Sequence, residues 1–245
     1  RFAVKLLAIE SSGLVASAAV FADDTIVAEF TVNNKQTHSQ TLLPMIDQVV
    51  TMSGIDLKEI DAIATTSGPG SFTGLRIGAA TAKGLGLALH KPIVPITTLE
   101  ALAFRLAGRE GNICPMMDAR RNQVYAGVYR VGDMLLECVT GQKAVSIEDY
   151  IAELNDLGDP VTVLGDGVPV HREALQQGLN VAWQEAPAHM NRQSAASVAV
   201  LGARYYDKGK IVSAEAFRPD YLRKSQAERE REARLAAGEK HDRDE

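Results

Sequence analysis

Short apolar runs followed by one amphipathic segment make up the first fifth of the chain. Alternating or continuous apolar residues predict strands over residues 4–9, 14–21 and 25–32. The Asp23-Asp24 pair between the last two runs is typical of a hairpin turn. Apolar residues at helical spacing then predict a helix over residues 39–53, in which Pro44 is tolerated near the start if Thr41 is the N-cap.

A strand, a helix and a further strand complete this first unit. The strand is predicted over residues 61–66, the long helix over 73–89 and the last strand over 93–96. Alternating strands and helices of this kind favour an α/β fold class. The first unit therefore has the order βββαβα.

The same order of elements begins again near residue 113. Strands are predicted over residues 113–117, 124–131, 134–139 and 161–164. Ser146 is a candidate N-cap for a helix over residues 147–154, and residues 165–167 are predicted to form a turn. Glu10 and Asp118 hold matching places after the first strands of the two units. The pattern indicates a duplicated unit, followed by a helix over residues 194–208.

Composition narrows the class of protein. The hydrophobic fraction of 46% in 245 residues is ample for a core, and the net charge of −5 argues against a surface devoted to nucleic acid. Two cysteines and no secretory segment at the start predict a reduced, cytoplasmic protein. No apolar run has the length of a membrane span.

The most specific motif is GPGSFTGLRIG at residues 68–78, between a predicted strand and a predicted helix. Such a loop brings backbone N–H groups close to a ligand or to another backbone. It is not a P-loop, because no Lys-Ser/Thr pair follows its last glycine, and it is not GxGxxG. Together with the loop after the first strand, it gives a degenerate phosphate-loop-like candidate site at Glu10, Ser11, Ser12, Gly13, Gly68, Gly70 and Ser71.

The motif resembles the signature of the TsaB (YeaZ) family, in which GPGSFTG is followed by Arg-Ile-Gly. The resemblance covers about residues 4–224 and implies an actin/sugar-kinase/Hsp70-like (ASKHA) fold, in which two RNase H-like lobes face a cleft. It implies an N-terminal lobe over residues 1–103, with the 194–208 helix packed back on it, and a smaller degenerate lobe over 104–224. Residues 225–245 form a charged tail, which we expect to be frayed or disordered.

The resemblance also implies the function. TsaB is a non-catalytic subunit in making N6-threonylcarbamoyladenosine, next to the anticodon of tRNA. In the family its paralogue TsaD transfers the threonylcarbamoyl group from threonylcarbamoyl-adenylate, and the P-loop ATPase TsaE joins at the TsaB–TsaD junction. TsaB alone forms a homodimer through the surface that it offers to TsaD. The implied partners are thus TsaD, TsaE and, through the complex, tRNA, with no membrane.

A metal site is not expected. TsaD binds its metal partly through a His-x-x-x-His pair on the helix after the last strand of its first lobe. The matching positions here are Thr98 and Leu102, and leucine cannot ligate a metal. The five histidines have no ligand spacing among them. We therefore expect no catalytic residue and no metal.

Two helices carry the expected partner interface. The residues are His38, Leu42, Met45 and Val49 on the first, and Gly74, Arg76, Gly78, Ala82 and Gly86 on the second. The four small residues of the second helix recur every four positions, so they form one stripe on which another backbone can pack closely. Whether that backbone belongs to the same lobe or to a partner stays open at this point. Arg76 either reaches a carboxylate across the interface or solvates the first helical turn.

Three rival functions remain. A small ATPase or kinase would use Glu10 and Asp118 around Mg-ATP, but residues 118–122 lack glycine and carry two long arginines. A metallopeptidase would need the histidine pair. The third is a protein that binds an adenine nucleotide at the heterodimer junction without hydrolysing it, and this alternative stays open.

Overall fold

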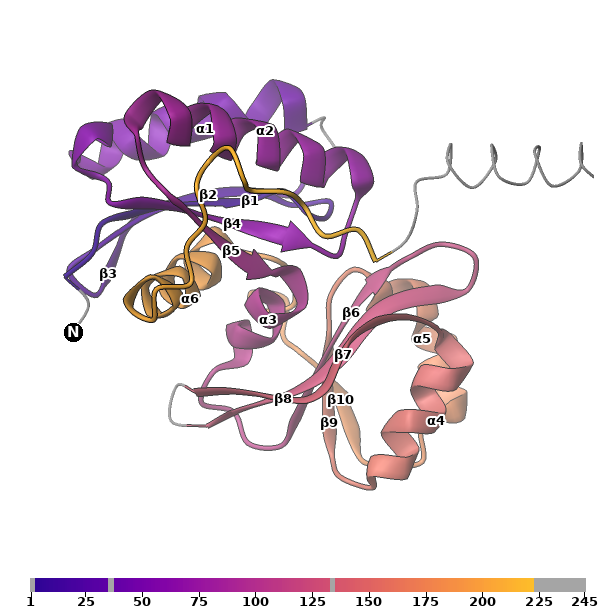
Figure 1. The fold of residues 1–245 in the computed structure, drawn as a ribbon. Helices are drawn as coiled ribbons and strands as arrows, with labels where there is room; N and C mark the ends of the chain where they lie inside the picture. Colours follow the sequence, from indigo (N-terminus) through magenta and orange to yellow (C-terminus); the bar gives the residue numbers. More distant parts are fainter. Residues whose placement is uncertain (1–2, 35–37, 133–134, 223–245) are drawn as a thin grey trace, which may run out of the picture.

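Two mixed five-stranded sheets with helices packed against them form the fold (Figure 1). This computed structural model describes residues 3–34, 38–132 and 135–222. The expected tail beyond residue 224 lies outside the described residues.

The first sheet has the strand order β3-β2-β1-β4-β5. Its strands are β1 (Leu6–Glu10), β2 (Ala16–Ala22), β3 (Thr25–Val32), β4 (Ala62–Gly68) and β5 (Ile93–Thr97). The pairs β1–β2 and β2–β3 are antiparallel, whereas β1–β4 and β4–β5 are parallel. Asp23 and Asp24 have φ of 52° and 60°, the left-handed backbone that a tight hairpin needs, so the predicted turn is confirmed.

Helices cover both faces of this sheet. α1 (His38–Ser53) and α2 (Phe72–Leu89) lie on one face and α6 (Ala195–Asp207) on the other (Figure 1). The prediction of Thr41 as the N-cap of the first helix is wrong, because the helix begins at His38 and Thr41 lies inside it. Pro44 consequently falls in the second turn, where its exposed ring points away from the sheet.

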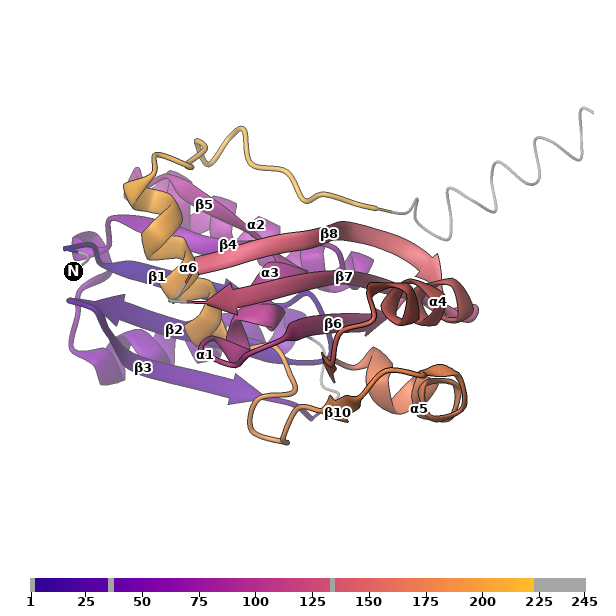
Figure 2. The same ribbon diagram turned by 90° about the horizontal axis from the view of Figure 1, so that it is seen from below.

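The second sheet repeats the first, with the order β10-β9-β6-β7-β8. Its strands are β6 (Asn112–Asp118), β7 (Gln123–Gly132), β8 (Leu135–Ser146), β9 (Val161–Leu164) and β10 (Trp183–Glu185). Here β6 takes the place of β1, antiparallel to β7 and parallel to β9. α4 (Ile147–Leu157) and α5 (Gly167–Gly178) lie beside this sheet (Figure 2). The duplicated unit, and with it the predicted ASKHA-type α/β fold, is confirmed.

Capping residues, turn residues and element length explain which helices and strands were predicted from the sequence and which were missed. Ser146 caps α4 as expected, because its Oγ accepts a hydrogen bond from Asp149 N–H at 3.1 Å. α5 was not predicted: it begins at Gly167 within the expected turn, and its helix is interrupted by non-helical angles at His171. β10 was missed because three residues leave no periodicity to detect.

Short helical segments connect the two sheets. These are α3 (Thr98–Ala103) and η2 (Phe104–Leu106), whereas η1 (Leu57–Glu59) lies between α1 and β4 within the first lobe. One apolar cluster contains Ala64 of β4, Leu102 of α3 and Leu164 of β9, so the lobes share a continuous core. Within the described ranges, no helix is long and apolar enough to cross a membrane.

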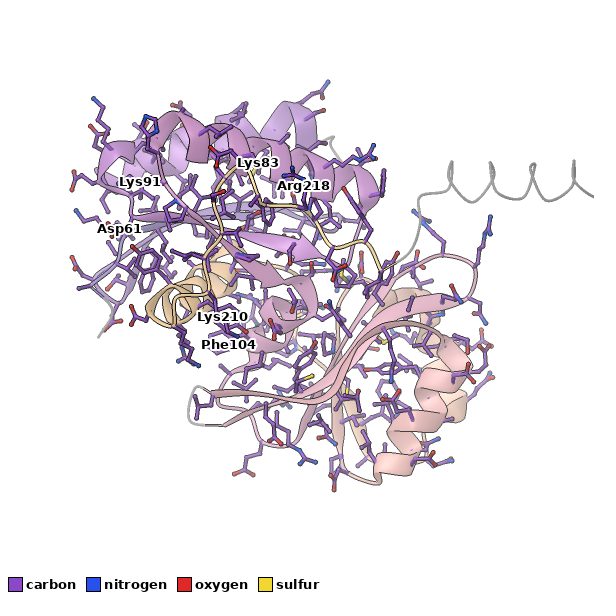
Figure 3. All side chains as sticks on the ribbon, viewed as in Figure 1. Asp61, Lys83, Lys91, Phe104, Lys210 and Arg218 are labelled. Atoms are coloured by element: carbon purple, nitrogen blue, oxygen red, sulfur yellow. The ribbon has the colours of Figure 1, made fainter. Side chains whose placement is uncertain are left out.

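After α6, the chain returns to the first sheet and runs along α2. We call residues 211–222 the strap. Val212 forms an antiparallel bridge to Ile93 of β5, and Asp220 N–H donates to the Ser67 carbonyl at 2.6 Å. The Lys83 ammonium of α2 donates to two strap carbonyls, those of Glu215 and Phe217, at 3.2 Å each. Figure 3 shows Lys83 and Arg218 side by side where the strap crosses α2.

Candidate functional site

A cleft of about 640 Å³ opens between the lobes. Its walls are the loops that follow β1, β4, β6 and β9, together with the end of the strap. In open α/β sheets, ligand sites form at the carboxyl ends of the parallel strands, and the cleft has that position. It is the natural candidate site.

The loop after β1 is folded around a carboxylate of the chain itself. Glu10 is fully buried, and its Oε1 accepts hydrogen bonds from Ser12 N–H at 2.6 Å and from Ser12 Oγ at 2.5 Å. Burial raises the pKa of Glu10 to about 7, because the charged form loses its hydration. The Ser12 N–H group, which a phosphate-binding loop would offer to a ligand, is thus engaged by Glu10.

The glycines of the 68–78 motif allow close contact with this same loop. A Cβ atom on Gly70 would lie 2.2 Å from the Ser12 carbonyl oxygen, and one on Gly74 would lie 2.1 Å from that of Ser11. Ser71 N–H donates to the Ser12 carbonyl at 2.6 Å, and Ser11 Oγ donates to the Gly74 carbonyl at 2.9 Å. The motif therefore locks two loops of one lobe together.

The same packing corrects our interface prediction for the small-residue stripe of α2. A Cβ on Gly78 would lie 2.2 Å from Ser11 Oγ, and one on Gly86 would lie 2.9 Å from Ala214 Cβ in the strap. Ala82 is fully buried in the core of the first lobe. The stripe, Gly74 included, packs inside its own chain and is not available to a partner.

The predicted α1 residues are also turned inward. Leu42, Met45 and Val49 are 1–3% exposed, because the helical stripe that they form packs on the first sheet. His38 Nε2 lies 2.7 Å from the Gly13 carbonyl, so the ring ties the start of α1 to the loop after β1. As with the stripe of α2, these side chains serve the chain's own fold.

The strap closes one side of the cleft. Gly68 has φ of 129°, and a Cβ there would lie 2.2 Å from the Asp220 carbonyl oxygen. The Phe72 and Tyr221 rings stack with centroids 4.6 Å apart and planes at 39°. The exposed Arg76 guanidinium lies 4.0 Å from the centre of the Phe72 ring, a cation–π contact that the sequence did not indicate.

The loop after β6 is built differently from its counterpart after β1. Arg120, Arg121 and Asn122 all have positive φ, and Asp118 Oδ1 accepts from Arg120 N–H at 2.8 Å. Asp166 Oδ1 accepts from Asp118 N–H at 3.3 Å, and burial raises the pKa of Asp166. The loops after β6 and β9 therefore give the cleft two neighbouring carboxylates, Asp118 and Asp166, and residues 118–122 offer no glycine-lined cradle for phosphate.

The two positions that match the TsaD histidines lie inside the protein. Thr98 and Leu102 of α3 are both fully buried. Among the residues that the structure describes, no group of three His, Cys, Asp or Glu side chains is placed to hold a metal ion.

Sequence reasoning overlooked the outward faces of the first two helices. Leu43 and Met52 of α1 are 57% and 73% exposed, and Leu87 of α2 is 45% exposed. Their signal was present, because each is a large apolar residue outside the buried stripe of its helix.

The fold and the cleft define an ASKHA-type protein. In its loop after β1, the Ser12 N–H group bonds to the chain's own Glu10 carboxylate. The family model "TsaD: tRNA N6-adenosine threonylcarbamoyltransferase" matches residues 25–231. The chain is 31% identical over 223 residues to tRNA threonylcarbamoyladenosine biosynthesis protein TsaB of Bacillus subtilis, covering 91% of this chain and 96% of that one. TsaB of Escherichia coli is 36% identical over 129 residues, or 52% of this chain and 55% of that one.

A solved structure agrees with these relatives. YeaZ from Pseudomonas aeruginosa superposes with a TM-score of 0.76 at 25% identity, covering 89% of this chain and 100% of that one. The chain belongs to the TsaB (YeaZ) family of tRNA threonylcarbamoyladenosine biosynthesis proteins, as the motif at residues 68–78 indicated.

Proposed function

We propose that this chain is a non-catalytic subunit that holds a TsaD-type transferase in its active state during the formation of N6-threonylcarbamoyladenosine in tRNA. Family membership supports the pathway. The observation that carries the non-catalytic role is the loop after β1, where Ser12 N–H and Oγ both donate to the buried Glu10. A carboxylate enclosed in this way is held away from any substrate.

The geometry of the cleft argues against a kinase or ATPase. Such an enzyme needs backbone N–H groups and a metal-binding carboxylate directed at the phosphates. Here the Ser12 and Ser71 N–H groups bond to Glu10 and to the Ser12 carbonyl. We expect no turnover of Mg-ATP by the chain alone. We also propose that an adenine nucleotide can bind, without being hydrolysed, at the junction between this chain and its partner.

The outer faces of α1 and α2 are the proposed partner surface. Leu43 of α1 and Leu87 of α2 expose apolar area that a partner would bury, at a gain of about 25 cal/mol per Å². TsaD and a second copy of this chain would use the same surface, and TsaE would join at its border. A subunit that binds one conformation of TsaD more tightly shifts TsaD toward that conformation by the difference in affinity.

A pair of matched leucine variants tests this surface. Leu43→Asp on α1 is compared with Leu135→Asp on β8, since the two side chains are 57% and 66% exposed. We expect the first variant to lose the heterodimer with cognate TsaD, measured by light scattering, and to lose stimulation of tRNA modification with it. The second variant should keep both. Equal binding by the two folded variants would remove the outer face of α1 from the interface.

A further inference from the structure

We infer that one surface of this chain contacts the phosphate backbone of tRNA within the complex that modifies it. The surface is made by residues 104–110, which include η2, and by residues 204–210, which include the C-terminal end of α6 and the turn after it. We call it the basic face. The inference rests on the proposed function, because the pathway of the family brings tRNA to this chain.

The basic face has a local excess of positive charge. Its two segments contain more cations than carboxylates, whereas the whole chain has a net charge of −5. The cations are Arg105, Arg109, Arg204, Lys208 and Lys210, and the carboxylates are Glu110 and Asp207. A further carboxylate, that of Glu100 on α3, lies beside the Tyr205 hydroxyl. The net charge of the chain therefore does not describe this surface, which attracts polyanions.

The fold brings the two segments of the basic face together. The Arg204 guanidinium of α6 lies 5.2 Å from the centre of the Phe104 ring in η2. After α6 the chain turns back, since Lys210 N–H donates to the Tyr205 carbonyl at 2.8 Å, and the Lys210 ammonium lies 4.3 Å from the centre of the Tyr205 ring. Figure 3 shows Lys210 and Phe104 next to each other at this end of α6. Cations that are far apart in the sequence thus share one surface.

Two arginines of the basic face are partly desolvated and have no ion pair. Arg105 and Arg204 are half-buried, and the buried Nε of each has no hydrogen-bond partner among the described residues. Burial lowers the pKa of both side chains, and Glu29 opposes this shift for Arg105. Arg105 Nη2 donates to an uncharged acceptor, the His189 carbonyl.

A phosphate would supply the missing counter-charge. In the part of the chain that the structure describes, none of the five cations of the basic face forms an ion pair with a carboxylate. A desolvated cation without a counter-charge costs free energy, and a phosphate group can accept two hydrogen bonds from one guanidinium. Binding of a phosphate backbone would therefore remove this cost.

The basic face suits RNA better than it suits a protein partner. A protein interface has an apolar centre, but neither segment exposes a large apolar side chain. Arginine and lysine side chains are the main groups that contact phosphates and fix the position of a nucleic acid. α6 also lies on the face of the first sheet opposite α1 and α2, so the basic face is distinct from the proposed partner surface (Figure 1).

The test measures binding of a fluorescently labelled tRNA transcript by fluorescence anisotropy, with the chain alone and with its complex with cognate TsaD. Lys208→Gln/Lys210→Gln removes two exposed cations of the basic face. Lys58→Gln/Arg121→Gln is the matched control, because it removes two exposed cations of η1 and of the hairpin after β6. Thermal unfolding verifies that both variants are folded.

We expect Lys208→Gln/Lys210→Gln to weaken tRNA binding by the complex about threefold or more, and to reduce its salt dependence. For each lysine that contacts a phosphate, the slope of log K against log salt concentration should become shallower by about 0.7 to 0.9. A merely structural role would not change this slope. The control variant should match the parent in affinity and in slope, and the chain alone should show the same differences at lower salt.

Light scattering of the chain with TsaD separates this inference from the proposed function. If the complex forms but Lys208→Gln/Lys210→Gln has the tRNA affinity and salt slope of the parent, the inference is wrong and the proposed function stands. If the parent forms no complex, the proposed function fails, and titration of the chain alone decides the inference by the same comparison. Absence of saturable tRNA binding, or loss of TsaD binding instead of tRNA binding in the variant, would also overturn the inference.

Discussion

At the scale of single residues, Glu10 is the most informative side chain. Its position after the first predicted strand made it a candidate for holding Mg-ATP. In the structure it is buried, and its Oε1 accepts hydrogen bonds from Ser12 N–H and Ser12 Oγ. The sequence could not show this difference, because a catalytic carboxylate and a buried structural one share the same place and the same small neighbours. Only the contacts of Ser12 N–H and Oγ distinguish the two.

The raised pKa of Glu10 predicts a pH dependence of stability. Its folded pKa of about 7 exceeds its unfolded value of 4.5, so the folded state holds the proton more tightly. The stabilising contribution is present in full below pH about 4.5 and is lost as the pH rises through about 7. The free energy of unfolding should therefore fall over this window, by roughly 3 kcal/mol in the limit.

Glu10→Gln isolates this contribution, because it cannot ionise. Urea unfolding from pH 5 to pH 8 should show a weaker pH dependence in this variant than in the parent. Glu110→Gln, at an exposed position, should follow the parent. Identical slopes for Glu10→Gln and the parent would mean that Glu10 ionises freely in the folded protein.

At the scale of elements, the GPGSFTG motif and α2 act as one packing unit. The sequence predicted the strand, the loop and the helix, and it identified the spacing of the small residues. It could not say which backbone approaches them, because that depends on the loop after β1, about sixty residues earlier in the chain. The answer is Ser11 and Ser12 of the same lobe.

Two glycines of α2 make a matched test of this packing. At Gly74 a Cβ would lie 2.1 Å from the Ser11 carbonyl oxygen, whereas at Gly84 nothing lies within 4 Å. Gly74→Ala should lower the free energy of unfolding by about 2 kcal/mol or more, since backbone must move. Gly84→Ala should raise it by up to about 1 kcal/mol, through helix propensity. Denaturant unfolding measures both, and equal effects would contradict the close packing.

The limits of sequence-based prediction are clear at the same scale. Helices with a clean apolar stripe or a serine cap, such as α1 and α4, were found to within a few residues. α5 was missed because Gly167 and Pro169 at its start are typical of a loop. The course of the strap could not be predicted from the sequence either. Its contacts with Lys83 and Ser67 are made by backbone groups of the strap and leave no pattern of residue types.

At the scale of the whole molecule, two surfaces differ in what they can bind. The outer faces of α1 and α2 carry isolated exposed apolar side chains, Leu43, Met52 and Leu87. Among the described residues that line the cleft are the carboxylates of Asp118, Asp166 and Asp220 and the guanidinium of Arg120. α1 and α2 lie on the face of the first sheet opposite α6 (Figure 1). The holding role that we propose for this chain rests on these outer helix faces.

The most direct test of this role is the rate of threonylcarbamoyladenosine formation in tRNA by cognate TsaD and TsaE, with the parent chain or with Glu10→Gln at saturating concentration. Glu10 is the acid that a phosphotransfer site in the loop after β1 would use. If the chain acts only by holding TsaD, both forms should support the same rate, and neither should form product without TsaD. A loss of about tenfold or more with Glu10→Gln, in a complex of unchanged mass, would show that the chain takes part in the chemistry.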